Sequence, residues 1–234
     1  SRQLTCVGLP APMTPRSLRY TIAMRKAFSF LDVLAPPTCL ACGINVPSNG
    51  MDALCENCAP QLPTDLVRIP SPVGIQHCWA LGCYEGLLGQ LVRCAKYQRS
   101  LMAADFLGEV LGGRLLGAVE TDAVVHVPTA WTRRAWRGFD QSERIAKGVA
   151  NELHVEPLSI LSRHGRIRQV GKSADQRRKL SGQTFSSRGL VRPRRVLLVD
   201  DVITTGTTMR VAADSLRRSG VEVIVGVSIA HRQL

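Results

Sequence analysis

Two neighbouring carboxylates followed by several threonines form the stretch of the chain with the clearest chemistry. In VLLVDDVITTGTT, residues 196–208, four apolar residues lead into Asp200 and Asp201, and Gly206 stands among four threonines. Such a turn before a helix binds phosphate, because glycine lets the backbone approach closely and N–H groups, hydroxyls and the helix N-terminus attract the anion. Carboxylates would repel phosphate but suit ribose hydroxyls or Mg²⁺. The stretch therefore predicts a site for a sugar with a terminal phosphate.

Four cysteines have the spacing of a metal site. The two C-x2-C pairs are Cys39 with Cys42 and, after twelve residues, Cys55 with Cys58. Two such pairs can close a tetrahedron of sulfur around one Zn²⁺, which leaves no open position and predicts a structural zinc. Disulfides or buried free thiols are the alternative, and the lack of an export signal disfavours disulfides because it indicates a reducing compartment. The other cysteines follow no such spacing, and we assign them no function.

The positive charge of the chain is concentrated in one segment. The 234 residues carry a net charge of +12, and residues 163–195 alone hold eleven Arg or Lys residues and one acid. This segment is poor in apolar residues and contains glycines, so we expect a flexible loop. Its charge predicts a polyanionic partner, either a phosphorylated small molecule or nucleic acid. The alternative is a solvated linker without a specific function.

Alternating strands and helices are expected to position the strand-end residues. Buried strands are predicted at AVVHVP (123–128), VLLVD (196–200) and VEVIVGVSIA (221–230), and an edge strand at HCWALGCYEG (77–86). Helices are predicted over 87–116, with a break near Arg99 and Ser100, over 141–153 and over 207–220. This order indicates an α/β fold, with a parallel sheet covered by helices on both faces. Ligands of such sheets bind at the carboxyl ends of the strands.

Composition sets the remaining boundaries. Residues 1–23 are expected to be disordered or a non-native extension, and Met24 begins an N-terminal helix and lead-in over 24–38. Residues 39–75 are assigned to the zinc ribbon and a linker, and residues 76–234 to the main domain. No apolar run approaches the roughly 20 residues of a membrane span, and the first residues lack the apolar core of a secretory signal. We therefore expect a cytoplasmic protein without membrane insertion.

Together these motifs resemble one family. VLLVDDVITTGTT is similar to the phosphoribosyl pyrophosphate (PRPP) binding motif of the type I phosphoribosyltransferases. With the C-x2-C ribbon, KYQRS from Lys96 and RRAWRGFDQSERIA from Arg133, the chain resembles the ComF family of competence-associated proteins. The resemblance implies a type I phosphoribosyltransferase fold with a small N-terminal zinc ribbon, and Mg²⁺ as a cofactor with PRPP. The chain departs from the family in having Asp140 where Asn is common and in having no C-x2-C pair, beyond Cys39/Cys42 and Cys55/Cys58, for the family's second ribbon.

The resemblance also implies roles for individual residues. Asp200 and Asp201 would hold the 2′ and 3′ hydroxyls of the ribose. The residues that would hold the 5′-phosphate are Thr204, Thr205, Gly206, Thr207 and Thr208, the turn for the pyrophosphate is Pro128, Thr129 and Ala130, and the family motif near the site holds Arg137, Gly138 and Gln141. Lys96 and Tyr97 match a family motif, but a surface lysine and a half-buried tyrosine explain them nearly as well. His126 is interpreted as a packed, neutral imidazole rather than a base.

Two functions remain open from the sequence. As an enzyme, the chain would transfer the pentosyl group of PRPP to an acceptor that the sequence does not identify, in DNA uptake or nucleotide salvage. The basic segment, with Arg177, Arg178 and Lys179, would then close over the site as a lid. As a non-catalytic competence factor, the chain would bind single-stranded DNA and the DNA-uptake machinery, and use PRPP only for regulation. Trp131 and Trp136 would then stack on bases, although packing or loop anchoring is their simpler interpretation.

Overall fold

The computed structural model describes residues 37–46, 53–163, 185–187 and 193–232. The chain divides into two compact units, Ser1–Leu62 and Pro63–Leu234. The predicted helix that begins at Met24 lies outside the described residues. Among the described residues, no helix is long and apolar enough to cross a membrane.

The larger unit is built on a six-stranded sheet. Its strands, in spatial order, are β1 (Val67–Ile69), β2 (His77–Cys83), β8 (Val223–His231), β7 (Arg195–Ile203), β3 (Ala123–His126) and β4 (Glu156–Leu158). All neighbours are parallel except β1 and β2, which pair antiparallel. The three buried strands predicted from the sequence are therefore confirmed. The prediction that HCWALGC is an edge strand is wrong, because the short β1 covers its outer side.

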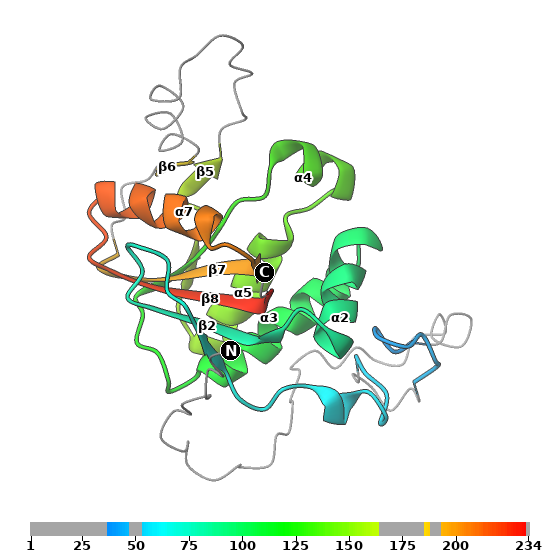
Figure 1. Cartoon of the computed structure of the whole chain (residues 1–234). Helices are drawn as coiled ribbons and strands as arrows, with labels where there is room; N and C mark the ends of the chain where they lie inside the picture. The colour runs from blue at the N-terminus through cyan, green and yellow to red at the C-terminus, as the bar shows by residue number, and fades with distance from the viewer. Residues whose placement is uncertain (1–36, 47–52, 164–184, 188–192, 233–234) are drawn as a thin grey trace, which may run out of the picture. The chain divides into compact units, whose positions relative to one another are not determined.

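Helices cover both faces of this sheet. On one side, α7 (Thr207–Arg218) packs its buried Met209, Ala212 and Leu216 against Leu198 of β7. On the other side lie α2 (Gly86–Tyr97), α3 (Leu101–Leu115) and α5 (Gln141–Leu153). Figure 1 shows this layering, with β7 and β8 between α7 and the pair α3 and α5. Strands enclosed on both faces must be apolar throughout, which explains the uninterrupted run Val196–Val199.

A close crossing of two helices holds one layer together. Gly108 of α3 and Gly148 of α5 face each other so closely that a Cβ on Gly108 would lie 2.6 Å from the carbonyl oxygen of Ile145. The two helices can approach to this distance only because neither residue has a side chain at the contact. The crossing fixes α5, and with it the start of that helix at Gln141.

We expect Gly108→Ala to lower the free energy of unfolding by about 1–3 kcal/mol, because the added methyl group forces α3 away from the backbone of α5. Chemical denaturation would measure the change. The matched control is Gly113→Ala in the same helix, where a Cβ would meet no atom within 4 Å. That control should stabilise the helix by about 0.5–1 kcal/mol, since alanine loses less backbone entropy than glycine. Equal effects of the two substitutions would contradict the close crossing.

The predicted break between α2 and α3 is confirmed. Arg99 has a positive φ of 56°, and Ser100 caps α3 by accepting a hydrogen bond from the N–H of Ala103 at 3.1 Å. Lys96 and Tyr97 therefore lie in the last turn of α2, directly before the break.

The basic segment differs from the expected loop at both ends. A two-stranded antiparallel ribbon joins β5 (Leu161–Arg163) to β6 (Phe185–Ser187), and β7 begins at Arg195. Phe185 is buried, and its carbonyl accepts a hydrogen bond from Ser215 of α7 at 3.3 Å. This one buried aromatic ring anchors the end of an otherwise polar segment. Arg177, Arg178 and Lys179 lie outside the described residues, so the proposed lid stays a prediction.

Candidate functional site

Two adjacent acids lie near the carboxyl end of β7. The strand continues three residues further than the sequence predicted, to Ile203, so Asp200 and Asp201 are still part of it. A carboxylate oxygen of Asp200 accepts hydrogen bonds from the N–H of Asp201 at 2.8 Å and from the hydroxyl of Ser142 at 3.3 Å. Asp201 forms an ion pair with Lys96, with 2.9 Å between Nζ and Oδ1. Both acids are therefore held by neighbours from two helices, α2 and α5.

The two acids at this strand end have one ion-pair partner among the described residues, Lys96. Burial, and then the negative charge of Asp201, raises the pKa of Asp200 to about 8, although the N–H of Asp201, Lys96 and Ser142 oppose the shift. Neighbouring carboxylates disfavour each other's ionised form. A divalent cation, or hydroxyl groups that donate to both acids, would relieve this repulsion, so the donor set fits either ligand.

The turn that follows the acids is open to an anion. Gly206 has a φ of 70° and is the N-cap of α7, and a Cβ at this position would lie 2.7 Å from Cγ of Pro72. Gly206 has no side chain to cap α7, the hydroxyl of Thr205 accepts only a long hydrogen bond of 3.4 Å from the N–H of Thr207, and the first turn has no acidic residue. The four exposed residues of the turn are Thr204, Thr205, Thr207 and Thr208. An uncapped helix N-terminus beside exposed hydroxyls favours binding of a phosphate.

The turn after β3 is tied to the start of α5 by Asp140. Its carboxylate caps α5 by accepting from the N–H of Ser142 at 3.1 Å and of Glu143 at 3.4 Å. It also accepts from the N–H and the hydroxyl of Thr129, at 2.8 and 2.9 Å. The asparagine that is common in the family has only one side-chain oxygen for these donors. Here Asp140 accepts four hydrogen bonds and fixes Thr129 beside the residues that hold Asp200.

The two other motifs of the sequence analysis meet at the same place. Arg137 ends the short helix α4 (Trp131–Arg137), which the sequence analysis missed. Its Nη1 donates to Oε1 of Gln141 at 2.6 Å, and its guanidinium lies 5.9 Å from the centre of the Tyr97 ring. KYQRS and RGFDQ therefore form one cluster with the strand-end acids. Lys96 is the functional candidate that the sequence analysis weighted too low, and its position in KYQRS was the signal for it.

Three aromatic residues differ from their expected environment. Tyr97 is 60% exposed rather than half-buried, and Trp131 and Trp136 are 76% and 52% exposed rather than packed. His126, at the end of β3, agrees with the interpretation as a packed imidazole, because its exposure is 6% and burial lowers its pKa against the opposing charges of Asp140 and Glu143. The aromatic side chains are thus available to a ligand, and His126 is not.

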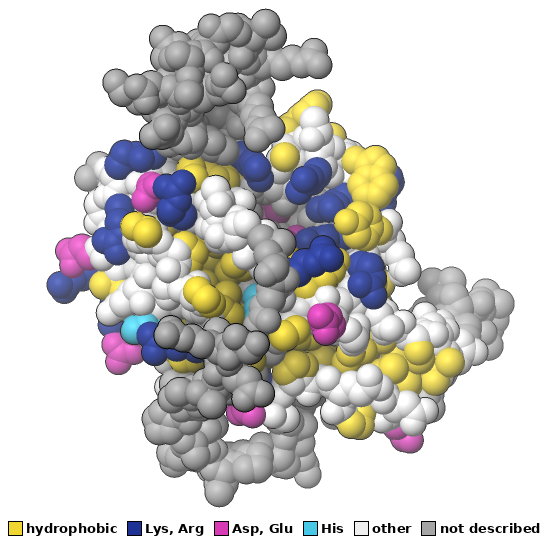
Figure 2. All heavy atoms as spheres, in the orientation of Figure 1, with side chains coloured by type: hydrophobic (Ala, Val, Ile, Leu, Met, Phe, Trp, Pro, Cys, Tyr) yellow, Lys and Arg dark blue, Asp and Glu magenta, His cyan; other side chains and the backbone are white. Residues whose placement is uncertain are grey.

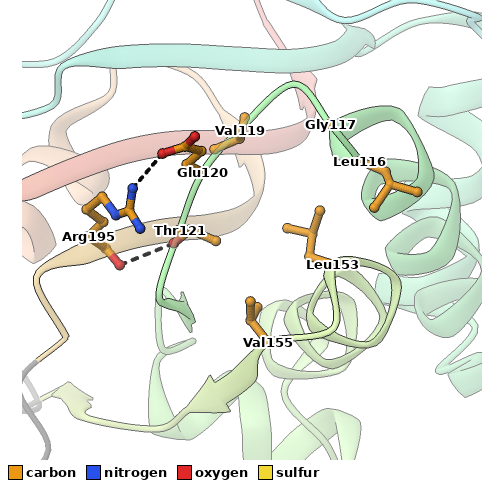
Figure 3. Close-up of a pocket in the computed structure, with 8 residues that line it drawn as sticks. All are labelled: Leu116, Gly117, Val119, Glu120, Thr121, Leu153, Val155 and Arg195. Atoms are coloured by element: carbon orange, nitrogen blue, oxygen red, sulfur yellow. Dashed lines mark hydrogen bonds and ion pairs between the residues drawn. The ribbon is translucent and has the colours of Figure 1, made fainter.

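A pocket at the amino ends of the strands, away from the acids, is not part of this site. It has a volume of about 280 Å³ and is lined by residues between α3 and β3, by Leu153 at the end of α5, by Val155 after it, and by Arg195 at the start of β7 (Figure 3). Its charged groups satisfy each other, since Arg195 pairs with Glu120 at 2.6 Å. Because Arg195 precedes Asp200 by five strand residues, the pocket lies about 16 Å from the acids.

The four C-x2-C cysteines come together in the smaller unit. Their sulfur atoms all lie within 4.8 Å of one another, and those of Cys42 and Cys55 are 3.6 Å apart. Sulfurs bound tetrahedrally to zinc at about 2.3 Å would be about 3.8 Å apart, so the cluster fits this ion. Gly43, with a φ of 74°, forms the turn after the first pair, and its N–H donates to the carbonyl of Cys39 at 2.9 Å.

The thiols of this cluster differ in how readily they ionise. Burial opposes the ionisation of Cys39, but N–H groups of Cys42, Cys55 and Ala41 outweigh it and lower the pKa to about 6. Burial and the neighbouring sulfurs raise the pKa of Cys58 to about 12. Four thiols crowded together thus compete for negative charge, and a bound cation would remove the competition. Among the described residues, every cysteine is a free thiol.

Comparison with known proteins identifies the family. The phosphoribosyl transferase domain matches residues 140–234. Competence protein F of Haemophilus influenzae is 29% identical over 200 residues, which cover 80% of this chain and 82% of that protein. DNA utilization protein YhgH of Salmonella typhi is 30% identical over 186 residues, which cover 74% of this chain and 81% of that protein. This chain belongs to the ComF family. The four-cysteine cluster and the parallel sheet then confirm the predicted fold class, a type I phosphoribosyltransferase fold with an N-terminal cysteine ribbon.

Two solved structures are similar to part of this ComF protein. The glutamine PRPP amidotransferase of B. subtilis, complexed with ADP and GMP, is 28% identical with a TM-score of 0.41 and covers 55% of this chain. An allosteric regulatory enzyme of purine biosynthesis is 27% identical with a TM-score of 0.42 and covers 56% of this chain. The chain spans about a quarter of each of them, 26% and 25% respectively.

Proposed function

We propose that this ComF protein binds PRPP at the carboxyl end of β7 and transfers its pentosyl group to an acceptor. The observation that carries the proposal is the pair of acids followed directly by the uncapped, threonine-lined start of α7. Asp200 and Asp201 hold the ribose hydroxyls, and the turn 204–208 holds the 5′-phosphate. The turn 128–130, fixed by Asp140, lies on the α5 side of the acids and receives the pyrophosphate.

The carboxylates of Asp200 and Asp201 also fit Mg²⁺, together with oxygens of PRPP. Carboxylates are the protein ligands that this hard cation prefers, and a bound cation would offset the burial and the charge of Asp201 that raise the pKa of Asp200. Bound Mg²⁺ would neutralise the charge that develops on the departing pyrophosphate. Lys96, already paired with Asp201, is the cationic side chain closest to these acids and would contact the ligand's phosphates once Mg²⁺ takes over the carboxylate.

Calorimetry with PRPP tests this proposal. We expect saturable binding of one PRPP per chain in the presence of Mg²⁺ and much weaker binding in EDTA. Ribose 5-phosphate should bind more weakly than PRPP, since it lacks the pyrophosphate. Absence of PRPP binding with Mg²⁺ in the folded protein would defeat the proposal. Turnover is then assayed separately as pyrophosphate release with a panel of nucleobases.

The surface of α4 supports a second candidate function, binding of single-stranded nucleic acid. Trp131 and Trp136 are exposed, the guanidinium of Arg99 lies 4.8 Å from the centre of the Trp136 ring, and Arg133 and Arg134 are exposed on the same helix. Figure 2 shows Lys and Arg side chains gathered around large hydrophobic side chains over α4. Exposed aromatic rings among cations are typical of proteins that stack unpaired bases. The names of the relatives, which refer to DNA utilization and competence, agree with this function.

We expect the double substitution Trp131→Ala and Trp136→Ala to weaken binding of an oligo-dT by about 30-fold or more, since stacking contributes about 1–3 kcal/mol for each of the two bases. Fluorescence anisotropy at several salt concentrations would measure this. The slope of log affinity against log salt should stay unchanged in this variant. In contrast, Arg133→Gln with Arg134→Gln should lower the slope by about 0.7 per lost phosphate contact. Leu116→Ala, an exposed apolar residue before β3, is the control.

A further inference from the structure

Arg137 is a buried cation without a counter-ion. Its exposure is 9%, and no ion pair among the described residues includes it. One nitrogen, Nη1, donates to Gln141, while Nε is buried and has no hydrogen-bond partner. The ring face of Tyr97 supplies only part of the missing negative potential. Burial of a guanidinium is unfavourable unless an anion compensates it, so this position lacks an acceptor.

Gln141, the partner of Arg137, also has a buried donor without an acceptor. It is fully buried, and its oxygen accepts from Arg137, but its Nε2 donates to no atom. A buried donor without a partner costs about 1–3 kcal/mol, and here two donors from contacting side chains are left over. Both lack the same kind of group, an acceptor oxygen. An anionic oxygen would satisfy both donors and also neutralise the guanidinium.

The two residues lie between the parts of the proposed PRPP site. Gln141 is the first residue of α5, and its neighbour Ser142 donates to Asp200. Asp140, on its other side, cannot serve Arg137, because its oxygens already accept from Thr129 and from the N-terminus of α5. Tyr97 adjoins Lys96, which pairs with Asp201. An anion that accepts from Arg137 and Gln141 would therefore lie beside Asp200 and Asp201, on the side of the turn 128–130.

The short helix α4 can give a ligand access to these donors. Arg137 is the only buried residue of its seven, so a shift of α4 exposes little apolar surface. Gly138, with a φ of 85°, ends the helix in a conformation that other residues adopt only with strain. The barrier to opening is thus set mainly by the contacts of Arg137 itself.

We propose that Arg137 and Gln141 form an oxyanion subsite that positions one charged oxygen group of a substrate. This inference rests on the proposed PRPP site and extends it by assigning a ligand class to these two side chains. The oxyanion is supplied either by the pyrophosphate of PRPP or by a carboxylate on the acceptor. In both cases the anion displaces Gln141 as the principal partner of Arg137 or binds alongside it.

Two substitutions test the subsite, one that removes its positive charge and one that adds a negative charge beside it. Arg137→Gln removes the cation, and Gln141→Glu supplies Arg137 with an internal anion that competes with the ligand. The probes are inorganic pyrophosphate with Mg²⁺, PRPP with Mg²⁺, and orotate compared with uracil in the presence of PRPP. We expect Gln141→Glu to raise the melting temperature of the free protein, while both variants lose at least 10-fold in affinity for an oxyanion probe. Arg93→Gln, an exposed arginine of α2, is the control and should bind every probe as the parent does.

The probes separate the two sources of the oxyanion. Parallel losses for pyrophosphate and PRPP would assign the subsite to the leaving group. A loss confined to orotate, with uracil and PRPP unaffected, would assign it to the acceptor. The subsite is overturned if both variants bind all probes like the parent, if the parent binds none of them, or if Gln141→Glu fails to stabilise the free protein. Unchanged PRPP binding in the variants leaves the proposed function intact, whereas pyrophosphate binding without PRPP binding defeats that function and keeps the subsite.

Discussion

Replacing Asp200 and Asp201 together by Asn is expected to weaken PRPP binding about 100-fold while leaving the fold intact. Hydrogen bonds to a charged group contribute about 1.5–3 kcal/mol, and each 1.4 kcal/mol corresponds to a factor of ten in affinity. Loss of two charged acceptors for the ribose hydroxyls, and of the Mg²⁺ ligands, therefore removes at least two such factors. Calorimetry with Mg²⁺ and PRPP on the double variant would measure the change.

The control for this experiment removes a carboxylate of α7 away from the turn. Asp214 forms a part-exposed ion pair with Arg210 at 3.4 Å, so Asp214→Asn should cost little stability and leave PRPP affinity unchanged. If the double variant binds PRPP as tightly as Asp214→Asn does, the two acids have another purpose. Circular dichroism of all variants would establish that the sheet is retained.

The single substitution Asp200→Asn should make the free protein more stable near neutral pH. The folded pKa of Asp200 is raised to about 8, first by burial and then by Asp201, so folding disfavours its ionised form. An acid with a raised folded pKa loses stability as pH rises from its unfolded pKa, about 3.9, through the folded value. Asp200→Asn removes this loss, and its melting temperature should exceed that of the parent at pH 8 by more than at pH 5. If the difference in melting temperature between Asp200→Asn and the parent is the same at pH 5 and pH 8, folding does not disfavour the ionised form of Asp200.

Much of the fold was predictable because the relevant signals are local. The run Val196–Val199 needs apolar neighbours on both faces wherever it lies, and the 3.6-residue periodicity of 141–153 places one helix face in the core regardless of partner. Consequently the strands at 123–128 and 221–230 and the three main helices were found. The extra strand β1 was missed because VRI has only three residues, and its pairing with β2 decides its conformation.

Much of the candidate site was not predictable, because it depends on contacts between distant segments. Lys96 and Asp201 are more than 100 positions apart, and the motif KYQRS marks Lys96 as a candidate without showing which acid it pairs with. The buried state of Arg137 likewise follows from the turn at Gly138 and the contact with Gln141. A motif can show that such residues belong together. Only the contact between Arg137, at the end of α4, and Gln141, at the start of α5, shows which donors lack an acceptor.

The second large effect is expected in the cysteine ribbon, where Cys55→Ser should release zinc and unfold residues 37–62. We propose that one structural Zn²⁺ binds Cys39, Cys42, Cys55 and Cys58, since their sulfurs already lie within 4.8 Å of one another. Among the described residues this unit has few regular elements, the bridge between Thr38 and Asn45 and the 3-10 helix η1 (Ala59–Gln61). So little structure cannot fold by burial alone, and zinc binding of about 10–16 kcal/mol in such peptides is then the main source of its stability.

Elemental analysis of protein purified without chelator should find one zinc per chain in the parent and less than a tenth of that in Cys55→Ser. Cys83→Ser is the matched control, because Cys83 is an exposed cysteine on β2 outside the cluster, and its zinc content should equal that of the parent. Acidification should release the metal, since protons compete for the thiolates. A parent protein without zinc, whose C-x2-C pairs are oxidised, would instead establish the disulfide alternative.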